Sequence, residues 1–194
     1  AMFDAGRSLL AAGVNLAALE LLTPALAAQP EWTLLIRLVG TTDGVAAEAA
    51  QLDGASGVRW APLAEAPAAA RWNLVARAPL EAELALRFGA LTDTLDDTMD
   101  LVIGSLGEGL LATGLGTGQL RWAGEADAST LRALRRRAAE REIPIPLERG
   151  GWPIRRAVGH FGAYREGVGM LVGRLRDAFD PKGVIAVALE GADE

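Results

Sequence analysis

Arg87 has the residue type and the position best suited to binding a small ligand. Residues 81–88 alternate apolar and polar side chains, which predicts a β-strand. The apolar face of this strand carries Ala82, Leu84, Leu86 and Phe88. The other face carries Arg87 with Glu81, Glu83 and Ala85. A guanidinium there can hold a carboxylate through two parallel hydrogen bonds, and the alternative is that it pairs with Glu83 or with solvent.

Trp122 and His160 are two further candidates for the same surface. His160 is the only histidine and follows Gly159. Because imidazole titrates near neutral pH, it is the natural general-base candidate, and a packing or surface role is the alternative. With one histidine and no cysteine, the sequence excludes a histidine-rich metal site, disulfides, thiolate nucleophiles and zinc fingers. We therefore expect no metal site.

Three other patterns each allow a chemical and a plain interpretation. The glycines at 114, 116 and 118 could approach a phosphate, but a strand-like segment follows them where a helix is needed, so we expect a hairpin turn. Aspartates at 93, 96, 97 and 100 form pairs four residues apart, which indicates a solvated helix face or a weak calcium site. The five arginines between 132 and 141 indicate a solvated helix face or an anion-binding surface.

The composition narrows the class of protein. The 194 residues suffice for one domain with a core, and 51% of them are apolar. A net charge of −6 argues against a protein that neutralises nucleic-acid phosphates. No apolar run is long enough to span a membrane, and the first residues lack the pattern of a signal peptide. We therefore expect a cytoplasmic protein that has no membrane span and binds no nucleic acid.

The elements that would position these residues alternate in kind. Strands are expected at 32–39, 58–60, 81–88, 109–113, 119–122 and 143–147, and 16–22 reads as a strand or a helix end. Helices are expected at the first residues, 45–52, 63–77, 92–102, from Ser129 or Thr130 to 140, and 166–179. This order predicts an α+β fold with two ferredoxin-like βαβ halves that share an antiparallel sheet, with helices on one face. A doubly wound parallel sheet is the rival, and the hairpin at 109–122 speaks against it.

The last third of the chain carries the most specific pattern. An apolar stripe at helical spacing consists of Val168, Leu171, Val172, Leu175 and Phe179. It predicts a final helix packed on the sheet, with a buried Phe179 whose replacement by alanine costs about 3–5 kcal/mol. The helix runs into Asp180-Pro181-Lys182-Gly183, where the proline ends it.

The string GVGMLVGRLRDAFDPKGVI at 167–185 resembles the C-terminal signature of FAD-linked oxidases of the vanillyl-alcohol oxidase type. The step Phe161-Gly162 is similar to that of the glycolate oxidase FAD-binding subunit. The segment WTLLIRLVGTTDGVAAEAAQL at 32–52 resembles the strand–helix unit that opens the cap domain in this family. The resemblance implies that residues 1–194 form a single cap, or substrate, domain from a larger flavoprotein.

The resemblance also implies partners and chemistry. The full-length protein would hold FAD on its own N-terminal domain, and the isolated chain would bind little or none. The substrate would be a 2-hydroxy acid or a related alcohol that the flavin oxidises, and other oxidase subunits are further partners. Residues 186–191 lack the family's Pro-Gly step and Gly159-His160-Phe161-Gly162 lacks its metal-binding histidine pattern, so catalytic residues stay unassigned. The alternative is a non-catalytic α+β interaction or regulatory module, and the sequence that precedes Met2 in the gene would distinguish the two.

Overall fold

Six strands form one antiparallel sheet in the computed structural model, which describes residues 2–162 and 167–184. The strands are β1 (Ala18–Leu22), β2 (Thr33–Arg37), β3 (Leu84–Gly89), β4 (Leu110–Gly114), β5 (Gln119–Gly124) and β6 (Leu147–Arg149). Their order across the sheet is β2-β1-β4-β5-β3-β6, and every neighbouring pair is antiparallel. The predicted α+β class is confirmed, and the parallel rival is wrong.

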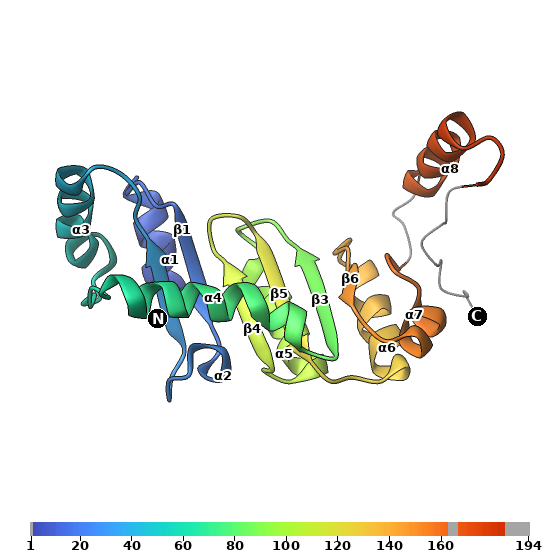
Figure 1. Ribbon diagram of the computed structural model, residues 1–194, viewed down its shortest axis with the longest axis horizontal. Helices are drawn as coiled ribbons and strands as arrows, with labels where there is room; N and C mark the ends of the chain where they lie inside the picture. The colour runs from blue at the N-terminus through green and yellow to red at the C-terminus, as the bar shows by residue number, and fades with distance from the viewer. Residues whose placement is uncertain (1, 163–166, 185–194) are drawn as a thin grey trace.

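Eight helices accompany the sheet in the part of the chain that the structure describes. They are α1 (Met2–Ala11), α2 (Pro24–Ala27), α3 (Thr42–Ser56), α4 (Glu65–Glu81), α5 (Leu95–Leu106), α6 (Ala128–Ala139), α7 (Trp152–Val158) and α8 (Val168–Phe179). Residues of α1, α3, α5 and α6 share the main core with one sheet face. Helix α4 crosses the other face (Figure 1), so the expectation that helices pack on one face only is wrong.

Helix α4 packs against the second face through a small apolar patch. Leu22, Leu35 and Ala112 lie on that face and pack against Ala78 of α4. Val75 and Trp72, about one and two turns before Ala78, add partly buried side chains to the same patch. Because burial of apolar area stabilises the fold, this patch holds α4 against one end of the sheet face.

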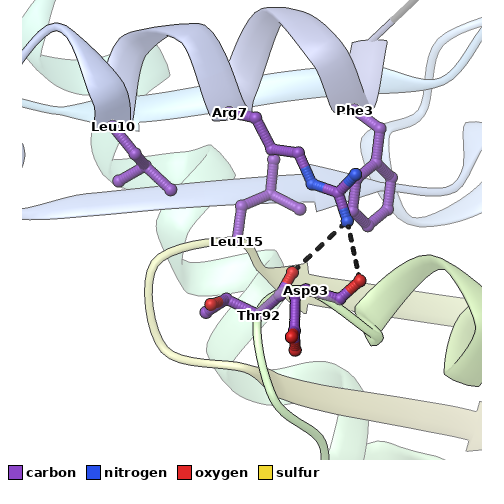
Figure 2. A pocket seen from close by; sticks show the side chains of 6 residues that line it. All are labelled: Phe3, Arg7, Leu10, Thr92, Asp93 and Leu115. Carbon is purple, nitrogen blue, oxygen red and sulfur yellow. Dashed lines mark hydrogen bonds between the residues drawn. The ribbon is translucent and has the colours of Figure 1, made fainter.

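Helix α1 is tied to the loop that precedes α5. Arg7 donates hydrogen bonds to the carbonyl oxygens of Thr92 and Asp93 at 3.4 and 3.3 Å, as Figure 2 shows. Its guanidinium also lies 3.4 Å from the Asp96 carboxylate and 5.2 Å from the centre of the Phe3 ring. These contacts fix the first helix to an element some 85 residues away in the sequence.

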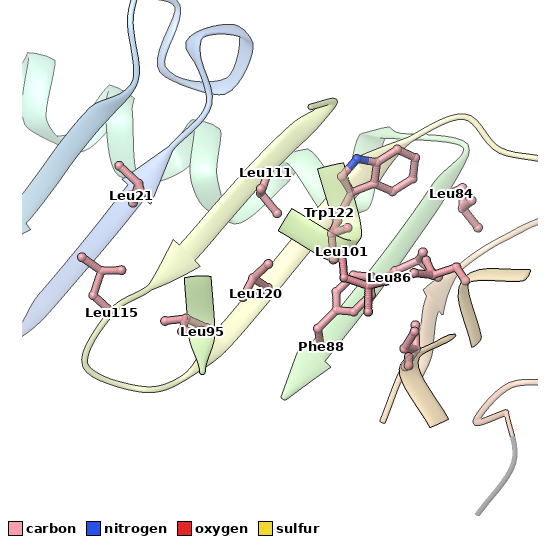
Figure 3. Packing of buried hydrophobic residues seen from close by; sticks show 14 of the residues in the cluster. Leu21, Leu84, Leu86, Phe88, Leu95, Leu101, Leu111, Leu115, Leu120 and Trp122 are labelled. Carbon is pink, nitrogen blue, oxygen red and sulfur yellow. The ribbon is translucent and has the colours of Figure 1, made fainter. Parts of the chain in front are cut away.

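The main core forms where the strand alternation predicts it. Leu84, Leu86 and Phe88 of β3 are 3%, 1% and 0% exposed. They meet Leu120 and Trp122 of β5 and the apolar side chains of α5 (Figure 3). The alternation of the 81–88 segment thus predicted the buried face correctly, although Glu81 ends α4 and β3 begins only at Leu84.

Several expected elements differ in the structure. Residues 58–60 form no strand, because the backbone N–H of Trp60 donates to Asp53 and its indole donates to Ser56, which folds this segment back on α3.

The N-cap of α6 is Asp127, two residues before the expected Ser129. The segment 143–147 contributes only its last residue to the edge strand β6. Helix α7 was not expected, and the glycine-rich loop at 114–118 closes the β4–β5 hairpin as predicted.

Helix α8 does not pack on the sheet. Phe179 is 80% exposed, Leu171 is 57% exposed, and no described residue of α8 is buried. The expected burial of Phe179 is therefore wrong. The sheet face that the apolar stripe would need is already covered by α1, α3, α5 and α6, whose side chains fill the main core. Among the described helices, α8 included, none has both the length and the apolar content needed to cross a membrane.

Candidate functional site

Arg87 lies on the sheet face opposite the main core. Leu86 and Phe88, its neighbours in β3, point into the core, whereas the Arg87 side chain is exposed. This follows from the two-residue period of a strand, and it confirms the predicted placement of Arg87. Helix α4 crosses this face, packing on Leu22, Leu35 and Ala112 and also contacting β3, β5 and β6. The rest, which we call the polar face, carries Glu20, Arg87, Gln119, Arg121 and Glu148.

Arg87 stands directly opposite Arg121 in the β3–β5 ladder. Two like charges at opposed positions of an antiparallel pair destabilise a sheet unless an opposite charge lies between them. Glu148 provides that charge: one of its carboxylate oxygens lies 3.6 Å from Nε of Arg87 and 3.3 Å from Nε of Arg121. The three side chains form one charged cluster, which we call the arginine pair with its counter-ion.

A bulge in the edge strand places Glu148 on the polar face. Residues Ala85 and Leu86 of β3 pair with Arg149 and Leu147, so that Glu148 is the extra residue between them. An extra residue re-aims a side chain relative to the alternation around it. Leu147 therefore stays in the core, 0% exposed, while the next side chain reaches the two arginines.

The arginine pair retains the capacity to bind an anion. Each guanidinium has five N–H donors, more than one shared carboxylate can accept. The exposed fraction of each arginine side chain is 44%, and Glu148 is the only acidic residue in the described part of the chain that forms an ion pair with either. With two positive charges and one negative charge, the cluster suits a small carboxylate, which planar guanidinium groups bind in a bidentate manner.

Glu20 extends the polar face toward the first strands. It lies opposite Gly114 in the β1–β4 ladder, and Gly114 lies opposite Gln119 of β5. Burial raises the pKa of Glu20 to about 7, and the nearby charge of Arg121 lowers it by a smaller amount. Within residues 2–162 and 167–184, no group donates a hydrogen bond to this carboxyl. Glu20 is thus a half-buried acid that changes charge near neutral pH.

Trp122 does not share the surface of Arg87. Its side chain is 1% exposed in the main core, and its indole N–H donates to the carbonyl oxygen of Gly107 at 3.2 Å. The expected role of Trp122 at that surface is wrong, because Trp122 pairs with the core residue Leu86 and strand alternation turns it away from the polar face.

His160 lies at the edge of the sheet, beyond β6, and does not join the arginine pair. Its carbonyl oxygen accepts a hydrogen bond from the N–H of Leu147 at 2.7 Å, and its ring meets Phe161 edge to face. Partial burial lowers its pKa, as do the charges of Arg155 and Arg135. These surroundings favour the neutral imidazole.

One of the five arginines expected on a solvated helix face is half-buried instead. Arg135 of α6 donates to four backbone carbonyl oxygens, those of Ile145, Val158, Gly159 and His160. Burial lowers the pKa of this guanidinium to about 10. Its donors satisfy the C-terminal end of α7 and the segment that follows, so its role is structural.

The remaining candidates form no evident site. A surface pocket of about 440 Å³ lies between α1 and the loop before α5, lined by Phe3, Arg7, Leu10, Thr92, Asp93 and Leu115 (Figure 2). Arg7 engages the two loop carbonyls and Asp96 there through Nη2. A second pocket of about 800 Å³ lies between the start of β3 and the N-termini of α6 and α7. No cluster of three acidic or histidine side chains that could hold a metal ion occurs within the described residues, so the calcium alternative finds no support.

The structure also bears on how a flavin could be held. The glycine-rich loop at 114–118 continues directly into β5, and no helix begins there to receive a pyrophosphate. These residues therefore do not fit the phosphate end of FAD.

Sequence reasoning missed Arg121, Glu148 and Glu20. Arg121 and Glu20 each stand between apolar neighbours in a strand, a pattern that could have identified them as polar-face residues. No such signal exists for Glu148, because a bulge sets its direction. No family model matches the chain, and no curated protein does either.

Proposed function

We propose that this chain is the cap domain of an FAD-linked oxidase of the vanillyl-alcohol oxidase type, and that Arg87 and Arg121 hold the carboxylate of a 2-hydroxy acid. The observation that carries the proposal is the pair of opposed guanidinium groups that share the single counter-ion Glu148. A substrate carboxylate would add the second negative charge, which balances the two arginines. The C-terminal signature and the cap-like segment at 32–52 supply the family part of the proposal.

We propose further that residues 84–149 form a ferredoxin-like unit. Its elements follow the order β3–α5–β4–β5–α6–β6, and its strands lie in the order β4-β5-β3-β6. A split βαβ unit of this type has two central strands that belong to different halves of the motif, as β5 and β3 do here. In this unit the arginine pair lies on the two central strands, β5 and β3, each of which is hydrogen-bonded to a neighbouring strand on both sides.

In this proposal the flavin and the residues of this chain have separate roles. The flavin, when bound to its own domain, supplies the two-electron oxidation of the substrate. This chain's residues bind and orient: Arg87 and Arg121 fix the carboxylate end, and Glu148 sets the separation of the two guanidinium groups. A fixed carboxylate restricts the direction in which the 2-hydroxy carbon can face.

Binding of a 2-hydroxy acid to the chain itself tests the proposal. We would titrate the ¹⁵N-labelled chain with lactate and follow the arginine side-chain and 119–124 backbone signals. The expected result is saturable binding, weakened about tenfold or more by Arg87→Ala and by Arg121→Ala. Arg77→Ala is the matched control, since this exposed arginine of α4 pairs only with Glu81 among the described residues. Absence of binding, or equal loss in the control, would contradict the proposal.

Kinetics on the reconstituted full-length flavoprotein provide the second test. If Arg87 holds the carboxylate, Arg87→Ala lowers kcat/KM by about 10- to 1000-fold, or about 1.4–4 kcal/mol. Purified alone, this chain should be colourless. A yellow chain with stoichiometric flavin would contradict the proposed division between the two domains.

The exposed apolar stripe of α8 favours a second candidate function, a non-catalytic interaction module. Its exposed members are Val168, Leu171, Leu175 and Phe179. Apolar side chains gathered on one exposed surface commonly mark a contact surface. A glycine-rich FAD-domain sequence ahead of Met2 in the gene would favour the oxidase, and a natural start codon at Met2 would favour the module.

A further inference from the structure

We propose that Glu20 completes the ligand site of the arginine pair by accepting a hydrogen bond from the 2-hydroxyl group of the bound acid. This inference rests on the proposed function, because it requires a carboxylate on Arg87 and Arg121. It adds a second point of contact, which would let the site distinguish a 2-hydroxy acid from a plain carboxylic acid.

The sheet register brings Glu20 close to the arginine pair. Glu20 of β1 and Arg121 of β5 are separated by β4 alone, about 10 Å between backbones. On this face β4 carries only small residues at the intervening positions, Gly114 opposite Glu20 and Ala112 opposite Arg121. No side chain of β4 therefore stands between the carboxyl and the guanidinium, and the charge of Arg121 acts on Glu20.

The β4 backbone limits where the Glu20 carboxyl can lie, and no protein group in the described part of the chain donates a hydrogen bond to it. A Cβ placed on Gly114 would lie 3.2 Å from its Oε1 atom, so the side chain lies flat against the β4 backbone. No group within the described residues donates a hydrogen bond to it. Because no buried side-chain oxygen among the described residues lacks a hydrogen-bond partner, the Glu20 oxygens are open to solvent, and a ligand hydroxyl group would take the place of a water molecule as donor.

Two contacts match the two polar ends of a 2-hydroxy acid. Its carboxylate accepts from the guanidinium donors, and its hydroxyl group, on the adjacent carbon, donates to Glu20. A plain carboxylic acid of the same size has only the first contact. A site built to pair with a hydroxyl group discriminates against the analogue that lacks it.

The charge of Glu20 also sets the electrostatics of the site. The charged groups on the strands around it are Arg37 on β2, Arg121 on β5, and beyond them Arg87 on β3 and Glu148 on β6. The turn at 115–118 adds only the Thr117 hydroxyl, and the Arg77 and Glu81 side chains of α4 pair with each other. Burial raises the pKa of Glu20 to about 7, so the carboxyl gains its negative charge between pH 6 and pH 8. An ionised Glu20 repels a plain carboxylate on Arg121.

The experiment compares lactate with propionate on the chain at pH 6 and pH 8, by the same ¹⁵N titration. We expect lactate to bind about tenfold more tightly than propionate at pH 8, the factor typical of a hydrogen bond to a charged group. Glu20→Leu should reduce this preference to less than twofold. The propionate dissociation constant should rise about threefold or more from pH 6 to pH 8 in the wild type, and less than twofold in Glu20→Gln. Glu31→Gln, on an exposed loop residue, is the control and should behave as wild type.

The outcomes separate the two proposals. If both acids bind equally well, lose affinity in Arg87→Ala and Arg121→Ala, and ignore the Glu20 variants, the role of Glu20 is refuted and the arginine site stands. If neither acid binds to the wild type, the arginine site itself is refuted. The wild-type comparison of the two ligands needs no variant, so a folding defect at position 20 cannot obscure the result.

Discussion

Glu20 and Gly114 face each other across the β1–β4 ladder, and a Cβ on Gly114 would lie only 3.2 Å from Oε1 of Glu20. A Cβ at position 114 would also collide with the hydroxyl of Thr117. We therefore expect Gly114→Ala to lower the free energy of unfolding by about 1–3 kcal/mol, as overpacking does. Urea unfolding measures the change. Gly116→Ala is the control, because its Cβ would lie at an ordinary 3.5 Å from Leu10, and an equal loss there would contradict this account.

The stability of the protein should depend on the charge of Glu20. Its pKa is raised from 4.5 to about 7 in the folded state, so the folded protein binds the extra proton between these values. The free energy of unfolding then falls as pH rises from about 4.5 to about 7, because the folded state holds more protons than the unfolded state.

Glu20→Gln removes this penalty and should stabilise the protein at pH 8 by about 1–3 kcal/mol relative to wild type. At pH 4.5 the two proteins should differ by less than about 0.5 kcal/mol. Denaturant unfolding at both pH values provides the measurement. If the free energies of unfolding of the two proteins differ by the same amount at both pH values, the pKa of Glu20 is not raised in the folded state.

Glu148 should stabilise the sheet by screening two like charges from each other. Its removal in Glu148→Ala leaves Arg87 and Arg121 directly opposed, and we expect a loss of about 0.5–1 kcal/mol at low salt. Because the cluster is partly exposed, the loss should shrink at 0.5 M NaCl. In the Arg87→Ala background the same change should cost less. A loss that salt and the second variant leave unchanged would mean that Glu148 acts through packing of the bulge.

The polar face shows which parts of the site could be predicted from the sequence. Alternation alone places Arg87 on the face opposite Leu86 and Phe88, and the structure agrees. The same rule applied to 119–122 would have found Arg121, since Leu120 and Trp122 flank it. That the two arginines stand opposite each other depends on strand order and register, which join residues 34 positions apart and leave no local trace.

Other features are invisible to local rules for identifiable reasons. Glu148 reaches the arginines through a bulge, which reverses the alternation of β6 at one residue. Arg135 looked like part of a solvated basic stripe, but the carbonyl groups that it binds come from residues 145 and 158–160. The stripe of α8 has the period of a packed helix, and periodicity cannot tell whether the sheet has a free face to receive it.

Arg135 should contribute more to stability than any other arginine of α6. Arg135→Ala leaves four carbonyl oxygens without this donor, and we expect a loss of about 2–4 kcal/mol. Arg132→Ala is the matched control on the same helix, since its one hydrogen bond, to Ala157, is exposed and should cost less than about 1 kcal/mol. Hydrogen exchange should report faster opening at Leu147, whose N–H donates to His160. Equal losses for the two variants would show that the Arg135 contacts are dispensable.

The last helix provides a test in which the sequence and the structure predict opposite results. The apolar stripe of α8 predicts a buried Phe179 and a loss of about 3–5 kcal/mol in Phe179→Ala. The structure leaves this ring 80% exposed, and an exposed ring that packs against little loses little on truncation, so we expect a change below about 0.5 kcal/mol. Leu134→Ala, at a 0% exposed position of α6, is the comparison and should cost about 2–5 kcal/mol. Urea unfolding of the two variants, in parallel with wild type, decides between the predictions. A loss for Phe179→Ala as large as that for Leu134→Ala would show that α8 packs against the domain in solution.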